Sequence, residues 1–535
     1  MLTPKWLDNA VIYEIYPQSF NDTNGDGIGD LRGIIDKLDY IKSLGCDAIW
    51  MNPCFESPFQ DAGYDISDFY KVAPRYGTNE DLWELFDKAH QKGMKVILDL
   101  VAGHTSIEHP YFKESCKHEM NEYSHYYVWS NYWGAWNTRY RFINGFAERH
   151  GNYMINFFYC QPALNYGFSK PEFEWEKRPE HPDCIKVREM MLDVMKYYLN
   201  HGCDGFRVDM AMSLIKGEDN YPDMQKLWGY YRDEVKKINP EAVLISEWGE
   251  PVAAINAGFD IDFIIQFASP GYISMLRNEK KRVPCSGHAK DTPSFFDSNC
   301  SKNSKIMNDE FIKLLAGTRE RGLLGIPTGN HDCGRIRQFR SFDDVKNAFA
   351  FIFASPAVPF LYYGDEIGMD YVYDLPSKEG GYVRTGARTP MQWSNSKNGG
   401  FSTGKEEDLY LPIDKANLAE NNVETQEKDE NSLLNFTRKI IAIRKANSAL
   451  GNLGEYHEVF ASETECPYVF LRKRDNQKVL CGFNPSQEKV VKELPNNFNL
   501  RSDFKYLLNE NCEVSIDKDK IYLTMNPNSY FWVEA

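Results

Sequence analysis

The chain has 535 residues and a formal net charge of −16, because 77 acidic residues outnumber 61 basic ones. No long basic run interrupts this acidic balance, so we expect no nucleic-acid partner and no anionic membrane surface as a partner. The first residues lack an apolar signal segment, and no stretch of about 18 apolar residues occurs, so neither export nor membrane insertion is expected. Twelve scattered cysteines without a C-x-x-C pair are typical of reduced thiols and predict a cytoplasmic location.

Short apolar segments alternate with amphipathic helix patterns over most of the chain. Between residues 31 and 44, apolar side chains recur at helical spacing, and Gly45 is expected to end that helix. A second such pattern ends at Gly93, and an apolar segment follows each glycine. We predict eight strands, at residues 10–16, 46–51, 94–100, 205–209, 243–247, 259–267, 323–327 and 358–362. Parallel strands alternating with helices predict an α/β fold, the (β/α)8 or TIM barrel.

Two segments depart from the barrel pattern. Residues 105–170 are rich in aromatic residues, Asn and His but show little periodicity, so we expect an inserted irregular subdomain after the third strand. The catalytic barrel is then predicted at residues 1–104 and 171–450, and its last helix at 433–446. Residues 451–535 carry short alternating strands and turn residues, which predicts a C-terminal all-β sandwich domain.

A loop near the N-terminus places oxygen-bearing side chains at alternate positions. Asp22, Asn24, Asp26 and Asp30 are interleaved with glycines that permit a sharp turn. Such a donor set suits a hard cation such as Ca²⁺, although the loop lacks the bidentate Glu that completes an EF-hand site. A plain turn held by Asp and Asn side chains is the alternative.

Four of the predicted strands end at, or lead to, an acidic residue: Asp99, Asp209, Glu247 and Asp332. The carboxyl ends of the strands of a closed parallel barrel face one pocket, so we expect these acids to converge. Arg207 should point the same way as Asp209, because residues two apart on a strand share a face. Each acid alone has a simpler explanation as a helix cap or a solvated loop residue.

Clustered carboxylates of this kind suit the cleavage of a glycosidic bond. One carboxylate stabilises the positive charge that develops at the anomeric carbon, and a protonated carboxyl group donates to the leaving oxygen. Like charges close together raise one pKa, which keeps that acid protonated near neutral pH. His104 and His331 lie just beyond two of the same strand ends.

These segments together resemble the α-amylase family of retaining glycoside hydrolases (family 13), and most closely its α-glucosidase and oligo-1,6-glucosidase branch. The resemblance rests on residues 63–66, 99–104, 205–209, 246–248, 330–332 and 387–393. It implies that Asp209 is the nucleophile, Glu247 the general acid and base, and Asp332 the residue that binds two ring hydroxyls and stabilises the transition state. It also implies that four further residues hold the sugar or the nucleophile: Tyr64, His104, Arg207 and His331.

The resemblance further implies a metal site and a mode of attack. A structural Ca²⁺ or Mg²⁺ ion would be bound by Asp22, Asn24, Asp26, the Ile28 carbonyl and Asp30. In the α-glucosidase branch, an acid three residues before the stacking tyrosine pairs with an arginine and closes the pocket around a terminal glucose. Asp61 and Arg388 occupy these positions, so we expect exo-action on short α-glucosides, with a salt bridge that binds no ligand as the alternative.

Three positions depart from the family pattern and leave part of the function open. Gly103 stands where Asn is usual, Ala163 stands where Asp is usual, and Met210 leaves the choice between α-1,4 and α-1,6 linkages open. The expected partner is a disaccharide or oligosaccharide, and the chain is expected to be a monomer or a weak homo-oligomer. A transglycosylase or isomerase of the same family, such as a trehalose synthase, is the rival function. A catalytically inactive carrier subunit is a third, but such a protein would lack the acids.

Overall fold

The computed structural model describes residues 3–133, 139–217, 219–277, 293–297 and 299–535. Its centre is a closed barrel with the strand order β1-β13-β12-β11-β10-β9-β5-β2, in which all neighbours are parallel. The strands are β1 (Ile12–Ile15), β2 (Ala48–Met51), β5 (Lys95–Leu100), β9 (Gly205–Val208), β10 (Val243–Ser246), β11 (Ile261–Phe263), β12 (Leu323–Pro327) and β13 (Val358–Tyr362). The predicted (β/α)8 barrel is therefore confirmed.

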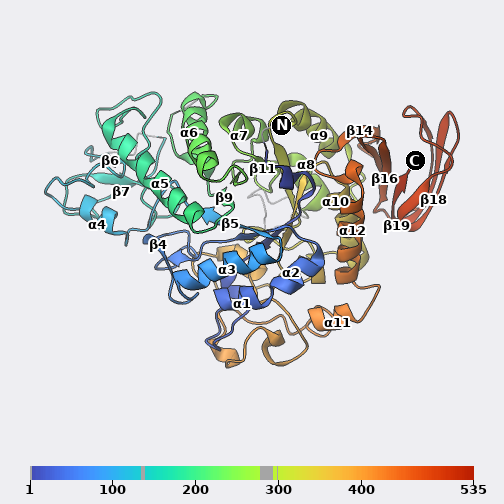
Figure 1. The fold of residues 1–535 in the computed structure, drawn as a ribbon, viewed down its shortest axis with the longest axis horizontal. Helices are drawn as coiled ribbons and strands as arrows, with labels where there is room; N and C mark the ends of the chain where they lie inside the picture. Colours follow the sequence, from blue (N-terminus) through green and yellow to red (C-terminus); the bar gives the residue numbers. More distant parts are fainter. Residues whose placement is uncertain (1–2, 134–138, 218, 278–292, 298) are drawn as a thin grey trace.

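Helices cover the outside of this barrel (Figure 1). They include α1 (Leu31–Asp36), α2 (Leu38–Leu44), α3 (Asn79–Gln91), α5 (Pro182–Asn200), α6 (Pro222–Ile238), α7 (Pro251–Ala257), α8 (Pro270–Leu276), α9 (Lys305–Thr318), α10 (Phe342–Ala354) and α12 (Leu433–Ala446). A short helix, α11 (Val423–Glu427), packs against α12. The single helix predicted over 31–44 is two helices, because Lys37 leaves the helical region at φ −103° and ψ 7°. Gly45 ends α2 with a φ of 94°, a left-handed conformation that glycine adopts without strain.

The alternation of side chains along β9 explains how an arginine is buried in the barrel. Phe206 and Val208 belong to the core between the strands and the surrounding helices. The residue between them, Arg207, points to the opposite side, where its guanidinium group lies 5.1 Å from the ring centroid of Trp50. Trp50 belongs to the apolar cluster inside the barrel. Arg207 therefore stands at the inner, carboxyl end of the barrel, where the predicted acids also lie.

The inserted segment after β5 has more regular structure than its lack of periodicity predicted. It contains α4 (Pro110–Ser115) and a small antiparallel sheet of β6 (Trp129–Ser130), β8 (Asn152–Met154) and β7 (Phe142–Asn144). Strands of two or three residues are too short for an alternating pattern to identify them. A further two-stranded sheet, β3 (Phe55–Glu56) and β4 (Asp68–Val72), lies between β2 and α3.

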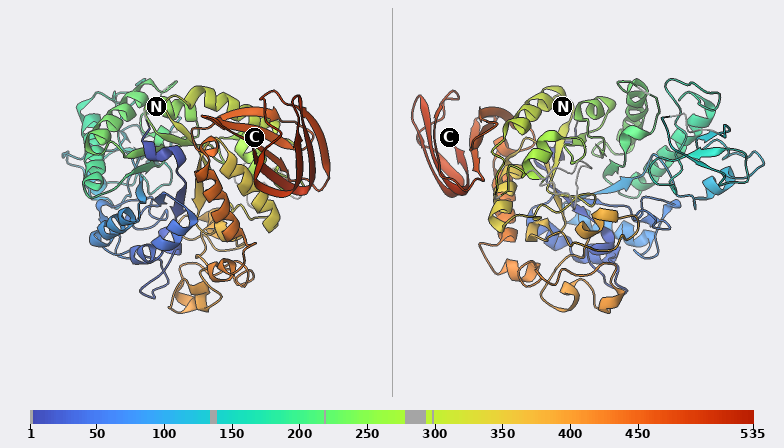
Figure 2. Two further views of the ribbon diagram at one scale, coloured as in Figure 1. Left: turned by 45° about the vertical axis from the view of Figure 1, so that its right-hand side comes forward. Right: turned by 180° about the vertical axis from the view of Figure 1, so that it is seen from behind.

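The C-terminal segment is an all-β domain, as predicted. Its six strands pair in the order β14-β15-β16-β19-β17, and β18 also pairs with β19. They are β14 (Glu455–Phe460), β15 (Tyr468–Arg474), β16 (Gln477–Asn484), β17 (Val490–Pro495), β18 (Lys505–Ile516) and β19 (Lys520–Glu534). This domain and the inserted segment lie on opposite sides of the barrel (Figure 2).

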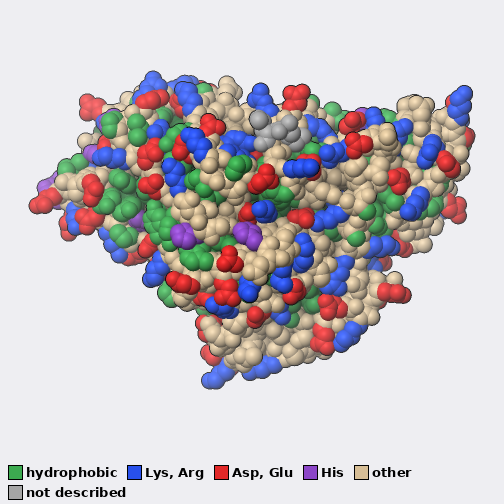
Figure 3. Space-filling view, viewed as in Figure 1, with side chains coloured by type: hydrophobic (Ala, Val, Ile, Leu, Met, Phe, Trp, Pro, Cys, Tyr) green, Lys and Arg blue, Asp and Glu red, His purple; other side chains and the backbone are tan. Residues whose placement is uncertain are grey.

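Charged side chains of both signs are interspersed over the molecular face shown in Figure 3. This distribution agrees with the absence of a long basic run in the sequence. In the described parts of the chain, no helix combines the length and the apolar character that a membrane span requires.

Candidate active site

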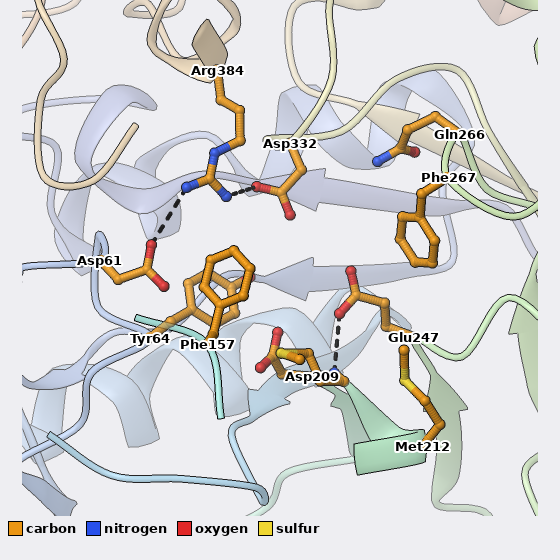
Figure 4. Close-up of a pocket in the computed structure, with 11 residues that line it drawn as sticks. Asp61, Tyr64, Phe157, Asp209, Met212, Glu247, Gln266, Phe267, Asp332 and Arg384 are labelled. Carbon is orange, nitrogen blue, oxygen red and sulfur yellow. Dashed lines mark hydrogen bonds and ion pairs between the residues drawn. The ribbon is translucent and has the colours of Figure 1, made fainter. Parts of the chain in front are cut away.

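A cavity of about 290 Å³ opens at the carboxyl ends of the barrel strands. The three predicted catalytic acids, Asp209, Glu247 and Asp332, all line it (Figure 4). Asp209 and Glu247 directly follow β9 and β10, and their backbone N–H groups donate to the carbonyls of Leu100 and Val208, each at 3.0 Å. Because the parallel hydrogen bonding continues through both residues, their carboxyl groups are held on the rigid rim of the barrel.

The guanidinium group of Arg207 connects three acids beneath this cavity. Its Nη1 lies 2.9 Å from Asp99 and 3.3 Å from Asp209, and its Nη2 lies 3.0 Å from Glu247. Arg207 is almost fully buried, so water screens these charges weakly. Asp99 in turn accepts a hydrogen bond from the indole N–H of Trp50 at 3.1 Å. One cation thus fixes the relative positions of Asp209 and Glu247.

Burial changes the protonation of this acid pair. Desolvation, with the nearby charge of Glu247, raises the pKa of Asp209 well above its ordinary value. Desolvation also raises the pKa of Glu247, although Arg207 opposes the shift. Two carboxyl groups that share one guanidinium in a dry site titrate as a pair. The pair can therefore retain one proton near neutral pH, which acid catalysis by one of its members requires.

Asp332 lies against two guanidinium groups instead. Burial opposes its ionisation, but Arg384 and Arg388 hold its pKa well below the ordinary value. Its Oδ1 lies 2.7 Å from Arg384 and 3.0 Å from Arg388. Burial lowers the pKa of His331 itself to about 3. Asp332 is therefore a permanent carboxylate, able to accept hydrogen bonds from hydroxyl groups.

The rings of Tyr64 and His331 stack on each other beside these acids. The ring centroids of the two lie 5.4 Å apart with an interplanar angle of 11°, and the Tyr64 hydroxyl lies 2.8 Å from His331 Nε2. The same hydroxyl donates to Asp99 at 2.9 Å. His331 Nδ1 lies 2.8 Å from the buried carboxyl group of Glu14. Tyr64 lines the cavity, whereas His331 lies behind it.

The expected pair of Asp61 and Arg388 makes no direct ion pair among the described residues, and its role in binding a sugar stays a prediction. Arg388 donates from its Nε to the His331 carbonyl at 2.7 Å and contacts Asp332 with its Nη2, while its charge still lowers the pKa of Asp61. Arg384 faces Asp61 instead, at 3.6 Å, and so bridges Asp61 and Asp332 across the cavity (Figure 4). Burial raises the pKa of Asp61 to about 6, although Arg384 opposes the shift.

Sequence reasoning missed Arg384 although a signal was available. It lies on the short 3₁₀ helix η6 (Tyr382–Ala387), which ends next to Arg388. Arginines four residues apart can meet the same group when the intervening backbone is helical. Here they meet Asp332 from two directions, since the Arg384 side chain is 19% exposed and that of Arg388 only 2%. A ligand in the cavity therefore meets Arg384 first.

His104 does not reach the cavity. Its Nε2 donates to the Tyr64 carbonyl at 3.1 Å, and its Nδ1 lies 3.1 Å from the amide nitrogen of Asn156. A Cβ atom on Gly103 would lie 2.7 Å from that same amide nitrogen. The glycine that departs from the family pattern thus leaves room for Asn156, whose amide supplies a polar contact to His104. His104 supports Tyr64 in this structure.

Five other residues line the cavity, and of these the sequence motifs singled out only Met210. Phe157 and Phe267 face the cavity and are partly exposed, at 37% and 45%. Met210, Met212 and Gln266 also line it. Met210 adopts a left-handed conformation, with φ 43°, and its N–H donates to Glu247 at 3.0 Å. These residues come from loops, where no periodicity indicates which side chains point inward.

The predicted metal loop lies apart from the cavity and is closed by its own hydrogen bonds. Asp22 accepts from the backbone N–H groups of Gly25 and Gly27 at 2.7 and 2.8 Å. Asp30 caps α1 through the Gly33 N–H. Within the described residues, no three His, Cys, Asp or Glu side chains gather closely enough to hold a metal ion by themselves. The donors are nevertheless all oxygens at alternate positions, a set whose chemistry fits Ca²⁺. The loop carries an Asx-turn network, and metal binding stays a prediction.

A closed parallel barrel with converging acids at its carboxyl end and a separate β domain defines an enzyme that acts on glycosides. The chain belongs to the α-amylase family, because residues 14–452 match the alpha amylase catalytic domain. This finding confirms the family that the sequence motifs indicated. Its homologues also include oligo-1,6-glucosidases, which agrees with the α-glucosidase branch of that family.

Two curated relatives illustrate the range of activities. The chain is 33% identical to the trehalose synthase/amylase TreS of Mycobacterium tuberculosis, over 90% of this chain and 82% of that protein. It is 31% identical to the oligo-1,6-glucosidase of Heyndrickxia coagulans, over 92% of this chain and 94% of that protein.

Two solved structures resemble the whole chain. The trehalulose synthase MutB superposes with a TM-score of 0.79 at 25% identity, over 99% of each chain. The trehalose-6-phosphate hydrolase of Bacillus licheniformis superposes with a TM-score of 0.78 at 25% identity, also over 99% of each.

Proposed function

We propose that this chain is a retaining α-glucosidase that releases glucose from the non-reducing end of short malto- or isomalto-oligosaccharides. The observation that carries this proposal is the Arg384 bridge between Asp61 and Asp332, at 3.6 and 2.7 Å. It places three charged groups across the cavity from the acid pair, so that end of the cavity can bind hydroxyl groups of a terminal sugar. The volume of about 290 Å³ is at the small end of ligand sites and suits a short substrate.

In the proposed reaction, Asp209 attacks the anomeric carbon while Glu247 protonates the departing glycosidic oxygen. Arg207 contacts both carboxyl groups and keeps the attacking one oriented. Asp332, held ionised by Arg384 and Arg388, accepts hydrogen bonds from ring hydroxyls as positive charge develops on the sugar. Glu247, now a carboxylate, then takes a proton from water, which cleaves the covalent glycosyl-enzyme.

A transglycosylase or isomerase of the trehalose synthase type is the second candidate. It is favoured by the similarity to TreS, which is 33% identical over 90% of this chain. Such an enzyme would form the same intermediate on Asp209 but would transfer the glucosyl group to a sugar hydroxyl. The partly exposed rings of Phe157 and Phe267 could hold that acceptor sugar.

One experiment separates the two candidates. Purified protein is incubated with maltose, isomaltose, sucrose and trehalose in turn, and the products are followed by proton NMR from the first minutes. Hydrolysis gives monosaccharides with no new disaccharide, whereas a rearranged disaccharide as the main product would overturn hydrolysis in favour of isomerisation. The anomeric outcome is followed with an aryl α-glucoside, whose only glucose comes from the cleaved ring, because the reducing-end glucose of maltose or isomaltose is already a mixture of anomers. Retention gives α-glucose first, and initial β-glucose from the aryl glucoside would overturn the retaining mechanism.

Three further expectations accompany this proposal. A structural Ca²⁺ or Mg²⁺ ion would be held by Asp22, Asn24, Asp26, the Ile28 carbonyl and Asp30, and the support for it is the all-oxygen donor set. A cytoplasmic location is supported by the scattered free cysteines. A monomer or weak homo-oligomer is the expected assembly.

A further inference from the structure

Two thiols meet where the barrel contacts the C-terminal domain. Cys300 precedes α9 in the barrel, and Cys466 lies in the turn between β14 and β15. Their sulfur atoms are 3.7 Å apart, although 166 positions separate the residues in the sequence. Cys466 is buried and Cys300 is partly exposed. Neither residue lies in the catalytic cavity, so the proposed glucosidase reaction does not use them.

The backbone on both sides holds the two thiols in this position. The N–H groups of Ser304 and Lys305 donate to the carbonyl of Ser462 at 2.9 and 3.2 Å, and the N–H of Ser462 donates back to the Ser304 hydroxyl at 3.1 Å. Lys302 also contacts Glu488 of the C-terminal domain at 2.8 Å. A disulfide has a sulfur–sulfur distance of about 2.05 Å, so the two sulfur atoms must come closer before they bond.

The surroundings favour a thiolate on one of the two sulfurs. A hydrogen bond from Cys300 lowers the pKa of Cys466, burial opposes this, and Ser486 and the charge of Lys302 add to the lowering. The N–H of Lys302 also donates to Cys300 at 3.2 Å. The thiolate is the form of cysteine that reacts with peroxides and disulfides. Either sulfur can therefore act as the nucleophile with the other as the resolving thiol, and Cys300 is the one that is partly exposed to solvent.

We propose that Cys300 and Cys466 are an oxidation site at which hydrogen peroxide forms a reversible disulfide between the barrel and the C-terminal domain. The thiolate of one cysteine attacks one peroxide oxygen, the O–O bond breaks, and hydroxide leaves, which gives a sulfenic acid. The thiol of the other cysteine then attacks that sulfur, the S–O bond breaks, and water leaves. Two electrons pass from the two thiols to peroxide, and a dithiol reductant reverses the change.

Peptide mapping tests the proposal on the full-length protein. Reduced protein is treated with hydrogen peroxide, remaining thiols are blocked with N-ethylmaleimide, and the digest is analysed by mass spectrometry. We expect a peptide pair that joins Cys300 to Cys466 and is two hydrogens lighter than its parts. Dithiothreitol should separate the pair. The cross-link should also raise the thermal midpoint by a few degrees, because it closes a long loop.

Matched variants make the result decisive. Cys300→Ser and Cys466→Ser should each reduce the cross-linked peptide to background, whereas Cys116→Ser, which removes another partly exposed thiol, should leave its yield unchanged. Cys300→Ala and circular dichroism of the untreated proteins show whether loss of the cross-link has a folding cause. Oxidation of Cys466 to sulfinic or sulfonic acid without the joined peptide would overturn the proposal. A joined peptide from a different cysteine pair would also overturn it.

Discussion

Arg384 and Asp61 face each other across the cavity at 3.6 Å, although the sequence pattern pairs Asp61 with Arg388. Both arginines contact the same oxygen of Asp332, one from the cavity and one from the buried side. Asp332 can therefore keep its charge while one of these arginines also meets a ligand. Arg384 is thus placed to contact a ligand, whereas Arg388 holds Asp332 from the buried side.

Arg384→Ala should weaken the binding of a terminal sugar without unfolding the protein. The side chain is partly exposed, and Arg388 still neutralises Asp332 in its absence. Loss of a charged hydrogen-bond donor is worth about 1.5–3 kcal/mol, so kcat/KM on a disaccharide should fall about 10- to 100-fold, mainly through KM. Steady-state kinetics check this. Arg501→Ala, on the exposed surface of the C-terminal domain, is the control. An unchanged KM would contradict the assigned contact.

Substituting the nucleophile should have the largest effect on turnover. Asp209→Asn should lower turnover by several orders of magnitude, because an amide cannot form the covalent intermediate.

Glu247→Gln should slow the cleavage of a disaccharide about 10²- to 10⁴-fold. It should slow the first step with an aryl glucoside less, because that leaving group departs without a proton. The glycosyl-enzyme should then accumulate on Asp209 and be visible by mass spectrometry. Glu250→Gln, outside the cavity lining, is the matched control. Equal losses with both substrates would argue against Glu247 as the acid.

The strands and the acid positions were predictable because they depend on local pattern and barrel geometry. The predicted bounds of Leu323–Pro327, Val358–Tyr362 and Leu433–Ala446 are those observed, since each apolar run has clear polar or turn boundaries. Asp209 and Glu247 follow from the rule that parallel strands end on one face. This reasoning needs no knowledge of contacts between distant segments.

The contacts of the loop residues were not predictable, because tertiary structure alone sets them. The four-residue spacing of Arg384 and Arg388 can suggest a shared partner, but it does not show that Arg384 faces Asp61. Asn156 reaches His104 from the inserted subdomain, 52 positions away. Neither contact is visible in the sequence pattern, so the motif comparison paired Asp61 with Arg388 and did not identify Arg384.

The pH dependence of KM should reflect the protonation of Asp61. Its pKa is raised to about 6 by burial, so the group is a carboxylate above that pH and neutral below it. As the pH falls from 7 to 5, Asp61 loses its attraction to Arg384 and its ability to accept two hydrogen bonds, and KM should rise. Asp61→Asn should remove this acidic rise in KM and should lower affinity mainly above pH 6, where the wild-type side chain is a carboxylate. A KM profile with the same acidic limb in the variant would rule out Asp61 as its source.

The N-terminal loop offers a direct choice between a metal site and a hydrogen-bonded turn. If Ca²⁺ binds, chelation by EDTA should lower the thermal midpoint and excess Ca²⁺ should restore it. Asp26→Asn keeps the oxygen that accepts from Ile28 N–H but removes the charge, so it should abolish the response to Ca²⁺. Because the loop residues do not line the cavity, kcat well below the midpoint should be unaffected. Midpoints that are equal with EDTA and with Ca²⁺ would leave the turn alone as the explanation.

The effects of substituting Gly103 and Asn156 should depend on each other. A Cβ on Gly103 would approach the Asn156 amide to 2.7 Å and the Ser213 hydroxyl to 2.9 Å, so Gly103→Asn should lower both stability and activity. Asn156→Gly removes the polar contact to His104 Nδ1 and should also be harmful. In the double variant, the new Asn side chain gains the vacated space and can restore a contact to His104.

A double-mutant cycle measures this compensation. We expect the two losses to be less than additive by about 1 kcal/mol or more, both in the free energy of unfolding by urea and in kcat/KM. Ser213→Ala in place of Asn156→Gly is the control, since it removes a neighbour without vacating the amide. Strict additivity would mean that the glycine and the asparagine do not compensate each other.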